Sequence, residues 1–210
     1  MSIKAIVLFS GGIDSTVLLY ELKRRRYELQ AVSFHYGQKH ARELHSAMTI
    51  CAALKIPRRV VTLPVLGGSS ITGGGTSPVV PNRNAIMLHV AASMAVASGF
   101  EVVAYGANKD DSENFPDCRP EFVESIGSSV ARAGLGITIL APFLGMPKWE
   151  VARLGMQLGV PFDKTWSCYL GGDFPCGSCL ACTTRLAALT KAREQQPGYA
   201  HDKKCTAPAK

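Results

Sequence analysis

Two groups of residues in this chain have the types and the spacing that chemistry requires. The first is the run from Leu8 to Leu18, where two glycines are followed by a carboxylate and hydroxyls. The second is a set of four cysteines near the C-terminal end, spaced C-x7-C-x2-C-x2-C. The first group predicts a site for nucleotide phosphates, and the second predicts a metal site.

The glycine run lies where a strand is expected to give way to a helix. Residues 3–9 are nearly continuously apolar, as in a parallel strand buried on both faces, and a helix is expected from about Ser15 to Arg25, with Asp14 or Ser15 as its cap. At such a junction glycines allow positive φ, and N–H groups at the helix start can face an anion. The lysine of the commoner G-x-x-x-x-G-K-[ST] loop is absent. A plain turn is the alternative.

The four cysteines are Cys168, Cys176, Cys179 and Cys182. Four thiolates can close a tetrahedron around one ion, and gaps of two residues let neighbouring sulfurs share it, so we expect structural zinc. With four sulfur ligands the ion would have no open position for water, and it would hold structure without taking part in chemistry. An iron–sulfur cluster and a redox dithiol are the alternatives.

Strands and helices alternate along the rest of the chain. Further strands are expected at residues 28–34, 58–63, 101–106 and 137–143, and further helices at 38–54, 84–98, 121–133, 148–158 and 183–195. This order predicts an α/β fold with a doubly wound parallel sheet. We expect an α/β domain over residues 1–160, a zinc-binding helical extension over 161–195 and a disordered tail over 196–210. The glycine-rich loop at 64–82 is a candidate lid.

The composition is that of a globular protein. Of the 210 residues 47% are hydrophobic and 19% charged, and no apolar run approaches the roughly 20 residues of a membrane span. No secretory signal opens the chain, so we expect a cytoplasmic protein without a membrane partner. The net charge of +7 could attract nucleic acid, but the basic cluster Lys23 to Arg26 closes a helix, where cations complement the dipole. We expect no stable nucleic-acid partner.

Further motifs make the chain resemble a known family. They stand at residues 36–40 (YGQKH), 80–84 (VPNRN), 116–120 (PDCRP) and 165–169 (TWSCY). With the glycine run and the four cysteines they resemble, in order, motifs of the 7-cyano-7-deazaguanine synthase family of PP-loop ATP pyrophosphatases, from about Ile3 to Arg185. In PP-loop enzymes this loop holds the leaving pyrophosphate of ATP during adenylation.

The resemblance implies a ligase that converts 7-carboxy-7-deazaguanine and ammonia to 7-cyano-7-deazaguanine, on the route to queuosine-type nucleosides. Adenylation by ATP would supply the leaving group that a carboxylate lacks, ammonia would give an amide, and a second activation would give the nitrile. The implied cofactors are ATP, Mg²⁺ and Zn²⁺. The implied partners are a deazapurine, ammonia and a second copy of the chain in a homodimer.

The resemblance also implies roles for single residues. Asp14 would engage Mg²⁺, and Arg83 would neutralise charge that builds in the transition state. Asp117, Cys118 and Arg119 complete the expected catalytic set. Asp111, Asp117 and Arg119 would face the base or the acyl group. A surface ion pair is the alternative for Arg83, and a salt-bridged loop is the alternative for Asp111, Asp117 and Arg119. The expected ATP-binding residues are Leu8, Phe9, Ser10, Gly11, Gly12, Ile13, Asp14, Ser15, Thr16, Val17 and Leu18.

One segment departs from the family pattern. Residues 111–115 have the sequence Asp-Ser-Glu-Asn-Phe, where the family usually shows Asp-Tyr-Ser-Gly-Tyr. A related PP-loop enzyme that adenylates another carboxylate or amide is therefore an alternative. So is a tRNA-modifying PP-loop enzyme, although such enzymes usually carry an added RNA-binding domain. A zinc- and nucleotide-binding module without catalysis is the third alternative.

Overall fold

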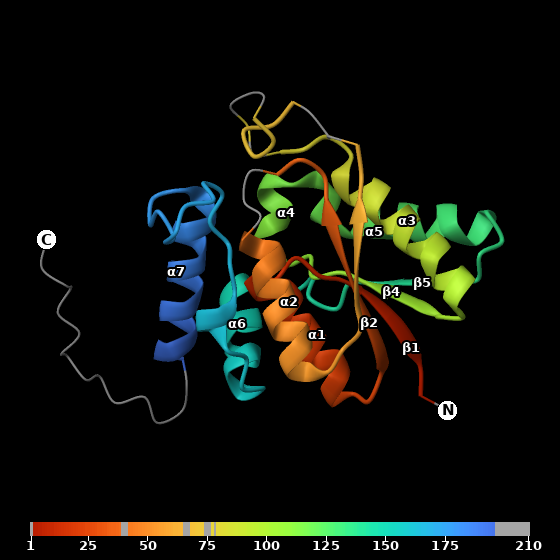
Figure 1. Ribbon diagram of the computed structural model, residues 1–210, viewed down its shortest axis with the longest axis horizontal. Helices are drawn as coiled ribbons and strands as arrows, with labels where there is room; N and C mark the ends of the chain where they lie inside the picture. The colour runs from red at the N-terminus through yellow and green to blue at the C-terminus, as the bar shows by residue number, and fades with distance from the viewer. Residues whose placement is uncertain (1, 39–41, 65–67, 74–76, 78, 196–210) are drawn as a thin grey trace, which may run out of the picture.

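Five parallel strands form one sheet in the order β3-β2-β1-β4-β5 (Figure 1). The computed structural model describes residues 2–38, 42–64, 68–73, 77 and 79–195, so the expected disordered tail and parts of the candidate lid lie outside the described residues. The doubly wound parallel sheet is confirmed. The strands are β1 (Lys4–Leu8), β2 (Glu28–His35), β3 (Arg58–Thr62), β4 (Val102–Ala104) and β5 (Thr138–Leu140).

Helices cover both faces of the sheet. In Figure 1, α1 and α2 lie on one side of β1 and β2, and α3 and α5 lie on the other. The expected helices are present with ends shifted by a few residues, apart from residues 39–41, which are not described. The four-residue α4 and two short 3₁₀ helices were not expected. The helices are α1 (Ile13–Arg24), α2 (Arg42–Leu54), α3 (Arg83–Ser98), α4 (Asp111–Asn114), η1 (Pro116–Cys118), α5 (Pro120–Arg132), α6 (Lys148–Gln157), η2 (Phe162–Lys164) and α7 (Leu180–Glu194).

The central strand β1 shows why its sequence is apolar throughout. Ala5 and Val7 belong to a buried cluster with Val17 of α1, whereas Ile6 belongs to a second cluster with Leu88 of α3. All five side chains are fully buried. Because successive side chains of a strand point to opposite faces, burial on both faces requires an unbroken apolar run. The strand therefore holds its carboxyl end, and the loop that follows, in a fixed place.

The loop after β1 is shaped by its glycines. Gly11 has a φ of 85°, and a Cβ atom there would lie 2.6 Å from the main-chain oxygen of Glu43 in α2. The expected capping of the helix was wrong: α1 begins at Ile13, Gly12 is the N-cap, and no side chain caps it. An N-cap residue needs extended backbone, whereas Asp14 lies inside the first turn. The N–H groups of this turn can therefore face a ligand.

The C-terminal helices pack beside α1. Val151 of α6 belongs to the same buried cluster as α1, and Ala152 contacts Ala188 and Ala192 of α7. Figure 1 shows α7 on the side of α6 that faces away from the sheet. Among the described residues, no helix has the length and the apolar character that a membrane crossing requires. The packing of α6 fixes the position of its first turn relative to the glycine loop.

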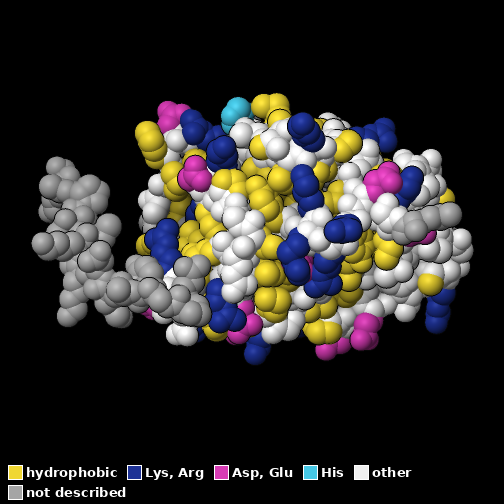
Figure 2. All heavy atoms as spheres, turned by 90° about the horizontal axis from the view of Figure 1, so that it is seen from below, with side chains coloured by type: hydrophobic (Ala, Val, Ile, Leu, Met, Phe, Trp, Pro, Cys, Tyr) yellow, Lys and Arg dark blue, Asp and Glu magenta, His cyan; other side chains and the backbone are white. Residues whose placement is uncertain are grey.

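Basic side chains gather on the face at the far end of α1, which Figure 2 views from below. The last turn of α1 contains Lys23 and Arg24. Arg24 and Arg25 form ion pairs with the buried carboxylate of Glu21, at 2.8 and 2.6 Å. Part of this positive charge is therefore neutralised within the helix end by Glu21. The absence of a nucleic-acid partner stays a prediction.

Candidate functional site

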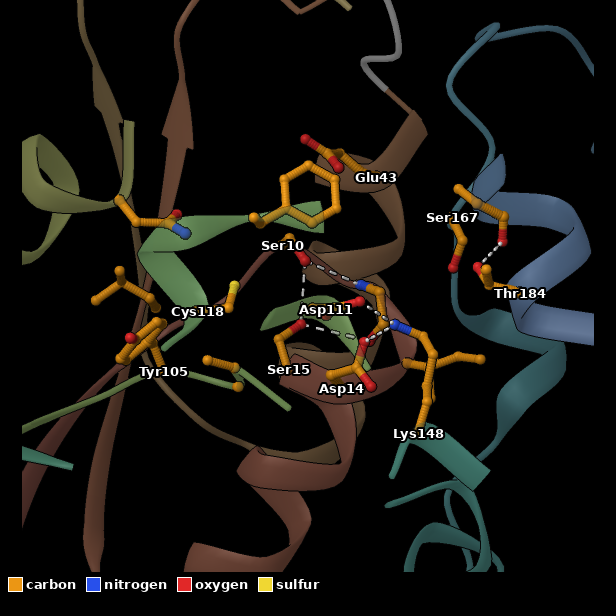
Figure 3. Close-up of a pocket in the computed structure, with 18 of the residues that line it drawn as sticks. Ser10, Asp14, Ser15, Glu43, Tyr105, Asp111, Cys118, Lys148, Ser167 and Thr184 are labelled. Carbon is orange, nitrogen blue, oxygen red and sulfur yellow. Dashed lines mark hydrogen bonds and ion pairs between the residues drawn. The ribbon is translucent and has the colours of Figure 1, made fainter. Parts of the chain in front are cut away.

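A cavity of about 550 Å³ opens at the carboxyl ends of the central strands. Leu8 of β1 and Phe34 of β2 line it. Tyr105, which follows β4, also lines it (Figure 3). Between β1 and β4 the chain changes direction across the sheet, since β2 and β3 lie on one side and β4 and β5 on the other. Ligands of open α/β sheets bind at this switch point. The volume of the cavity lies in the range of small-molecule sites.

Most residues of the expected ATP-binding run line the cavity. Gly11 lies against α2 instead, and Thr16, Val17 and Leu18 are fully buried behind the loop. Thr16 Oγ1 donates a 2.7 Å hydrogen bond to the carbonyl of Gly12, which ties the helix to the turn. These four residues shape the loop without reaching the cavity wall. Those that line the cavity are Leu8, Phe9, Ser10, Gly12, Ile13, Asp14 and Ser15.

Hydrogen bonds within the loop fix its hydroxyl groups. Ser10 Oγ accepts a hydrogen bond from the main-chain N–H of Gly12 at 3.2 Å and lies 3.1 Å from Ser15 Oγ. Both serine side chains line the cavity (Figure 3). Hydroxyls and N–H groups that are already in place need little rearrangement when an anion arrives, and this favours binding. We call residues 10–16 the phosphate loop.

A lysine that the sequence reasoning missed reaches the phosphate loop from α6. Lys148 Nζ donates hydrogen bonds to Asp14 Oδ2 at 2.8 Å and to Asp111 Oδ1 at 3.4 Å. Its own main-chain N–H donates to Asp110 Oδ2 at 3.0 Å. A cation in the first turn of a helix opposes the helix dipole, so a lysine at this position was the available signal that carboxylates lie nearby.

The charges of Lys148, Asp14 and Asp111 influence one another. Burial lowers the pKa of Lys148, but the carboxylates of Asp14 and Asp111 outweigh burial and hold it above its ordinary value. Burial raises the pKa of Asp111, and the charge of Asp14 adds to the rise, while Lys148 opposes it. Lys148 is therefore a cation at neutral pH. Among the described residues, Asp14 is the one expected ATP-binding residue that forms an ion pair, and Lys148 is its partner.

One oxygen of Asp14 has no partner among the described residues. Asp14 Oδ1 is buried and accepts no hydrogen bond there, whereas Oδ2 accepts one from Lys148. A buried carboxylate oxygen without a partner is costly, and a cation would relieve that cost. Mg²⁺ prefers carboxylate oxygens and phosphate oxygens as ligands. The donor set of Asp14 therefore fits Mg²⁺ beside bound phosphate.

Arg83 lines the cavity on the α3 side. Its Nη1 donates a 3.2 Å hydrogen bond to the hydroxyl of Tyr36, and its guanidinium carbon lies 5.7 Å from the centre of the Tyr36 ring. Burial raises the pKa of Tyr36, and Arg83 opposes this rise. The structure thus brings Arg83 to the same cavity as Asp14, held by a neutral phenol. A carboxylate or phosphate group in the cavity could receive its remaining N–H donors.

The structure separates the three expected catalytic residues of the PDCRP motif. Cys118 lines the cavity, but Asp117 and Arg119 do not. The carbonyl of Asp117 accepts a hydrogen bond from Tyr105 at 3.3 Å, and Arg119 Nε donates to the carbonyl of Ser112 at 3.1 Å. The contacts shown for Asp117 and Arg119 shape the loop around the cavity. Their catalytic roles stay predictions.

Burial raises the pKa of the Cys118 thiol to about 12, with the charges of Asp117 and Asp111 adding to the rise. Cys118 is therefore a neutral thiol at neutral pH, and the thiolate is the form that acts as a nucleophile. We expect Cys118→Ala to lower kcat less than about tenfold, since loss of a covalent nucleophile costs about 10⁴-fold or more. Steady-state kinetics measure this, with Cys51→Ala as a control for a lost buried thiol. A loss near 10⁴-fold would assign Cys118 a covalent role.

The four cysteines form a compact group, which we call the cysteine cluster. Their Sγ atoms all lie within 4.8 Å of one another, and the Sγ atoms of Cys176 and Cys182 are 3.9 Å apart. A tetrahedral ion with sulfur ligands at about 2.3 Å needs sulfur atoms about 3.8 Å apart. The cluster could therefore hold one metal ion such as zinc. Cys168 and Cys182 are buried, which suits a structural site.

The segment that leads to the cysteine cluster contacts the phosphate loop. The main-chain N–H of Trp166 donates a 2.9 Å hydrogen bond to the carbonyl of Gly11. Arg42 of α2 lies over the Trp166 ring at 5.4 Å and forms an ion pair with Asp173. Trp166 and Ser167 line the cavity. Sequence motifs far apart in the chain thus meet at one site.

Solved structures share this fold. A U34-tRNA thiolase, NcsA from Methanococcus maripaludis with its [4Fe-4S] cluster, matches with a TM-score of 0.58 and 20% identity over 94% of this chain and 67% of its own. An NMN synthetase from Francisella tularensis matches with a TM-score of 0.57 and 19% identity over 94% and 79%. At such identities the likeness concerns the fold alone.

Comparison with sequence relatives identifies the family of this chain. A 7-cyano-7-deazaguanine synthase of Caldicellulosiruptor bescii is 40% identical over 92% of this chain and 96% of its own length. Another from Archaeoglobus fulgidus is 41% identical over 89% and 85%. The model of the family described as "Queuosine biosynthesis protein QueC" matches residues 4–193. The chain therefore belongs to the QueC family of queuosine biosynthesis proteins.

Proposed function

We propose that this protein is a 7-cyano-7-deazaguanine synthase, a carbon–nitrogen ligase that uses ATP and ammonia to convert 7-carboxy-7-deazaguanine to the nitrile. One observation carries the proposal: in a chain of the QueC family, Asp14 with Lys148 and Arg83 lie on the wall of one cavity at the switch point of the sheet. Adenylation needs groups that bind pyrophosphate, and it needs a positively charged side chain near the acyl group. On this wall Asp14 with Lys148 would meet the first need, and Arg83 would meet the second.

ATP would bind with its phosphates at the phosphate loop. The uncapped first turn of α1 offers N–H groups, Ser10 and Ser15 offer hydroxyls, and Lys148 offers a positive charge. Asp14 would hold Mg²⁺ through its unpartnered oxygen, as its donor set suggests. When bound, Mg²⁺ would neutralise phosphate charge. The lysine that P-loop proteins carry within the loop is thus supplied here by α6.

The apolar part of the cavity suits a planar base. Phe34, Met87 and Tyr105 line it, and Ile71, which is 4% exposed, covers part of it. Of the segment that departs from the family pattern, Asn114 and Phe115 line the cavity together with Asp111. An apolar wall excludes water, which protects an acyl adenylate from hydrolysis. Selectivity for the deazapurine would depend on this wall.

The chemistry then follows in two rounds. In the first, a carboxylate oxygen of the substrate attacks the α-phosphorus of ATP, and the bond to pyrophosphate breaks while Lys148 stabilises the departing charge. Ammonia attacks the acyl carbon, loses a proton, and AMP leaves to give the amide. In the second round, the amide oxygen attacks the α-phosphorus of a second ATP and pyrophosphate leaves, and loss of AMP and of both amide protons then gives the nitrile. Arg83 would stabilise negative charge next to the acyl carbon in both rounds.

Further properties belong to this proposal. We propose Zn²⁺ at the cysteine cluster, because its sulfur atoms have the spacing of a tetrahedral site. A cytoplasmic location is supported by Cys51 and Cys118, which lie outside the cluster and form no disulfide among the described residues, since thiols persist in reducing compartments. A homodimer is supported by apolar side chains open to solvent near the cluster, with Phe174 83% and Leu170 68% exposed.

The test is product analysis of purified protein incubated with ATP, Mg²⁺, ammonia and 7-carboxy-7-deazaguanine. Mass spectrometry is expected to show the amide and then the nitrile, and the nucleotide product is expected to be AMP. Omission of ammonia should stop both products, and Asp14→Asn should remove them. Release of ADP in place of AMP, or turnover that depends on tRNA and ignores the free base, would contradict the proposal.

A further inference from the structure

Arg185 lies on α7 behind the cavity wall and donates three hydrogen bonds to a single short segment. Its Nη1 donates to Thr165 Oγ1 at 2.7 Å and to Ser167 Oγ at 3.4 Å, and its Nη2 donates to the carbonyl of Phe162 at 2.6 Å. Arg185 does not line the cavity. The guanidinium therefore holds residues 162–167 against α7. About one turn before Arg185, α7 contains Cys182, the last residue of the cysteine cluster.

This segment forms one side of the phosphate loop. Between the two residues whose hydroxyls Arg185 binds lies Trp166, whose N–H donates to the carbonyl of Gly11. The carbonyl of Trp166 lies 3.5 Å from the position of a Cβ atom on Gly12. The loop thus has α2 on one side, where Gly11 approaches the backbone of Glu43, and Trp166 on the other.

A glycine pair needs such restraint from outside. Glycine loses more conformational freedom on ordering than other residues do, so a Gly-Gly turn without fixed neighbours would sample many conformations. The hydrogen bond from Trp166 limits the orientation of the Gly11 peptide, and the following N–H groups turn with it. A loop that is fixed before ATP arrives binds ATP more tightly than a loop that must be ordered on binding.

We propose that Arg185 is a positioning residue for ATP: by holding Thr165 and Ser167 it fixes Trp166, and Trp166 fixes the phosphate loop. The inference rests on the proposed use of ATP. Arginine is needed because its planar fork reaches hydroxyl and carbonyl acceptors together, which a lysine ammonium on a flexible stem does not. The apolar residues proposed to face the deazapurine, Phe34, Met87 and Tyr105, lie outside the segment that Arg185 holds, so its affinity is expected to be independent of Arg185.

The experiment compares wild type, Arg185→Met and Arg185→Lys. Both variants are expected to raise the Kd of ATP, measured by calorimetry with ATP and Mg²⁺ alone, by about tenfold. The KM for ATP should rise in parallel, and the KM for 7-carboxy-7-deazaguanine should stay within about twofold of wild type. Arg193→Met, at an exposed position farther along α7, is the matched control and should leave all three values unchanged.

Metal analysis and thermal unfolding separate positioning from folding. If Arg185→Met loses its metal or its cooperative unfolding, Thr165→Val decides, because it removes one acceptor of Arg185 and keeps the side-chain shape. An unchanged Kd for ATP in a folded, metal-loaded variant overturns the inference, and so does an equal rise in the KM of both substrates. The Kd of ATP is measured without the deazapurine. Failure of the nitrile reaction would therefore overturn the proposed function, but the comparison of Kd between wild type and the Arg185 variants would remain valid.

Discussion

Lys148→Met is expected to lower kcat/KM by about 10²–10³-fold, the cost of removing one preorganised group that stabilises transition-state charge. Methionine keeps much of the length of the side chain and removes the ammonium that binds Asp14 and Asp111. Two consequences follow from its removal. The departing pyrophosphate loses a cation, and the two carboxylates lose the positive charge that lies between them, so their repulsion increases.

Kinetics with ATP varied at saturating 7-carboxy-7-deazaguanine and ammonia measure this effect. Loss in kcat is expected to exceed the rise in the KM for ATP, because charge on the pyrophosphate is largest in the transition state. Lys109→Met is the matched control, since Lys109 is exposed and its main chain makes the hydrogen bonds shown for it. Activity of Lys148→Met within about twofold of wild type would exclude Lys148 from the chemistry.

The fold could be predicted from the sequence because local patterns determine it. An apolar run such as β1 is explained by burial on both faces, and alternation of strands and helices leaves little choice besides a parallel sheet. The short α4 had no such pattern. It follows an Asn108 side chain that bonds both the main-chain N–H and the carboxylate of Asp111. Four residues are too few for a periodic signal.

The candidate site was predicted in part. The glycine run and Arg83 were identified because their motifs are contiguous, but Lys148 is separated from Asp14 by 134 positions. Such a pair becomes neighbours only when α6 packs on α1, a result of tertiary structure. The wrong cap has a local origin: α1 begins at Ile13, so Asp14 lies inside the first turn, where its carboxylate binds Lys148. A motif also does not show which of its side chains line a cavity. Within the PDCRP motif, Cys118 lines the cavity, whereas Asp117 and Arg119 do not.

Removing the metal proposed for the cysteine cluster is expected to lower Tm by at least about 10 °C and turnover by about 100-fold, as in small domains whose metal-binding energy is folding energy. Cys182→Ser is expected to do the same. No helix or strand lies between η2 and α7 in the described chain, so residues 165–179 depend on the cluster and on a few hydrogen bonds. Without the ion, Cys168 no longer fixes the segment that contains Trp166.

The measurements are metal content, thermal unfolding and turnover of chelator-treated protein and of Cys182→Ser. The matched control is Cys205→Ser, which changes a cysteine other than the four of the cluster and should retain metal, Tm and activity. Lost turnover at unchanged Tm would indicate that the ion takes part in the reaction, against the structural role. Unchanged values for both in metal-free protein would contradict the dependence of the phosphate loop on the cluster. Return of Tm and turnover on addition of Zn²⁺ completes the test, because a structural site formed by four thiolates should refill.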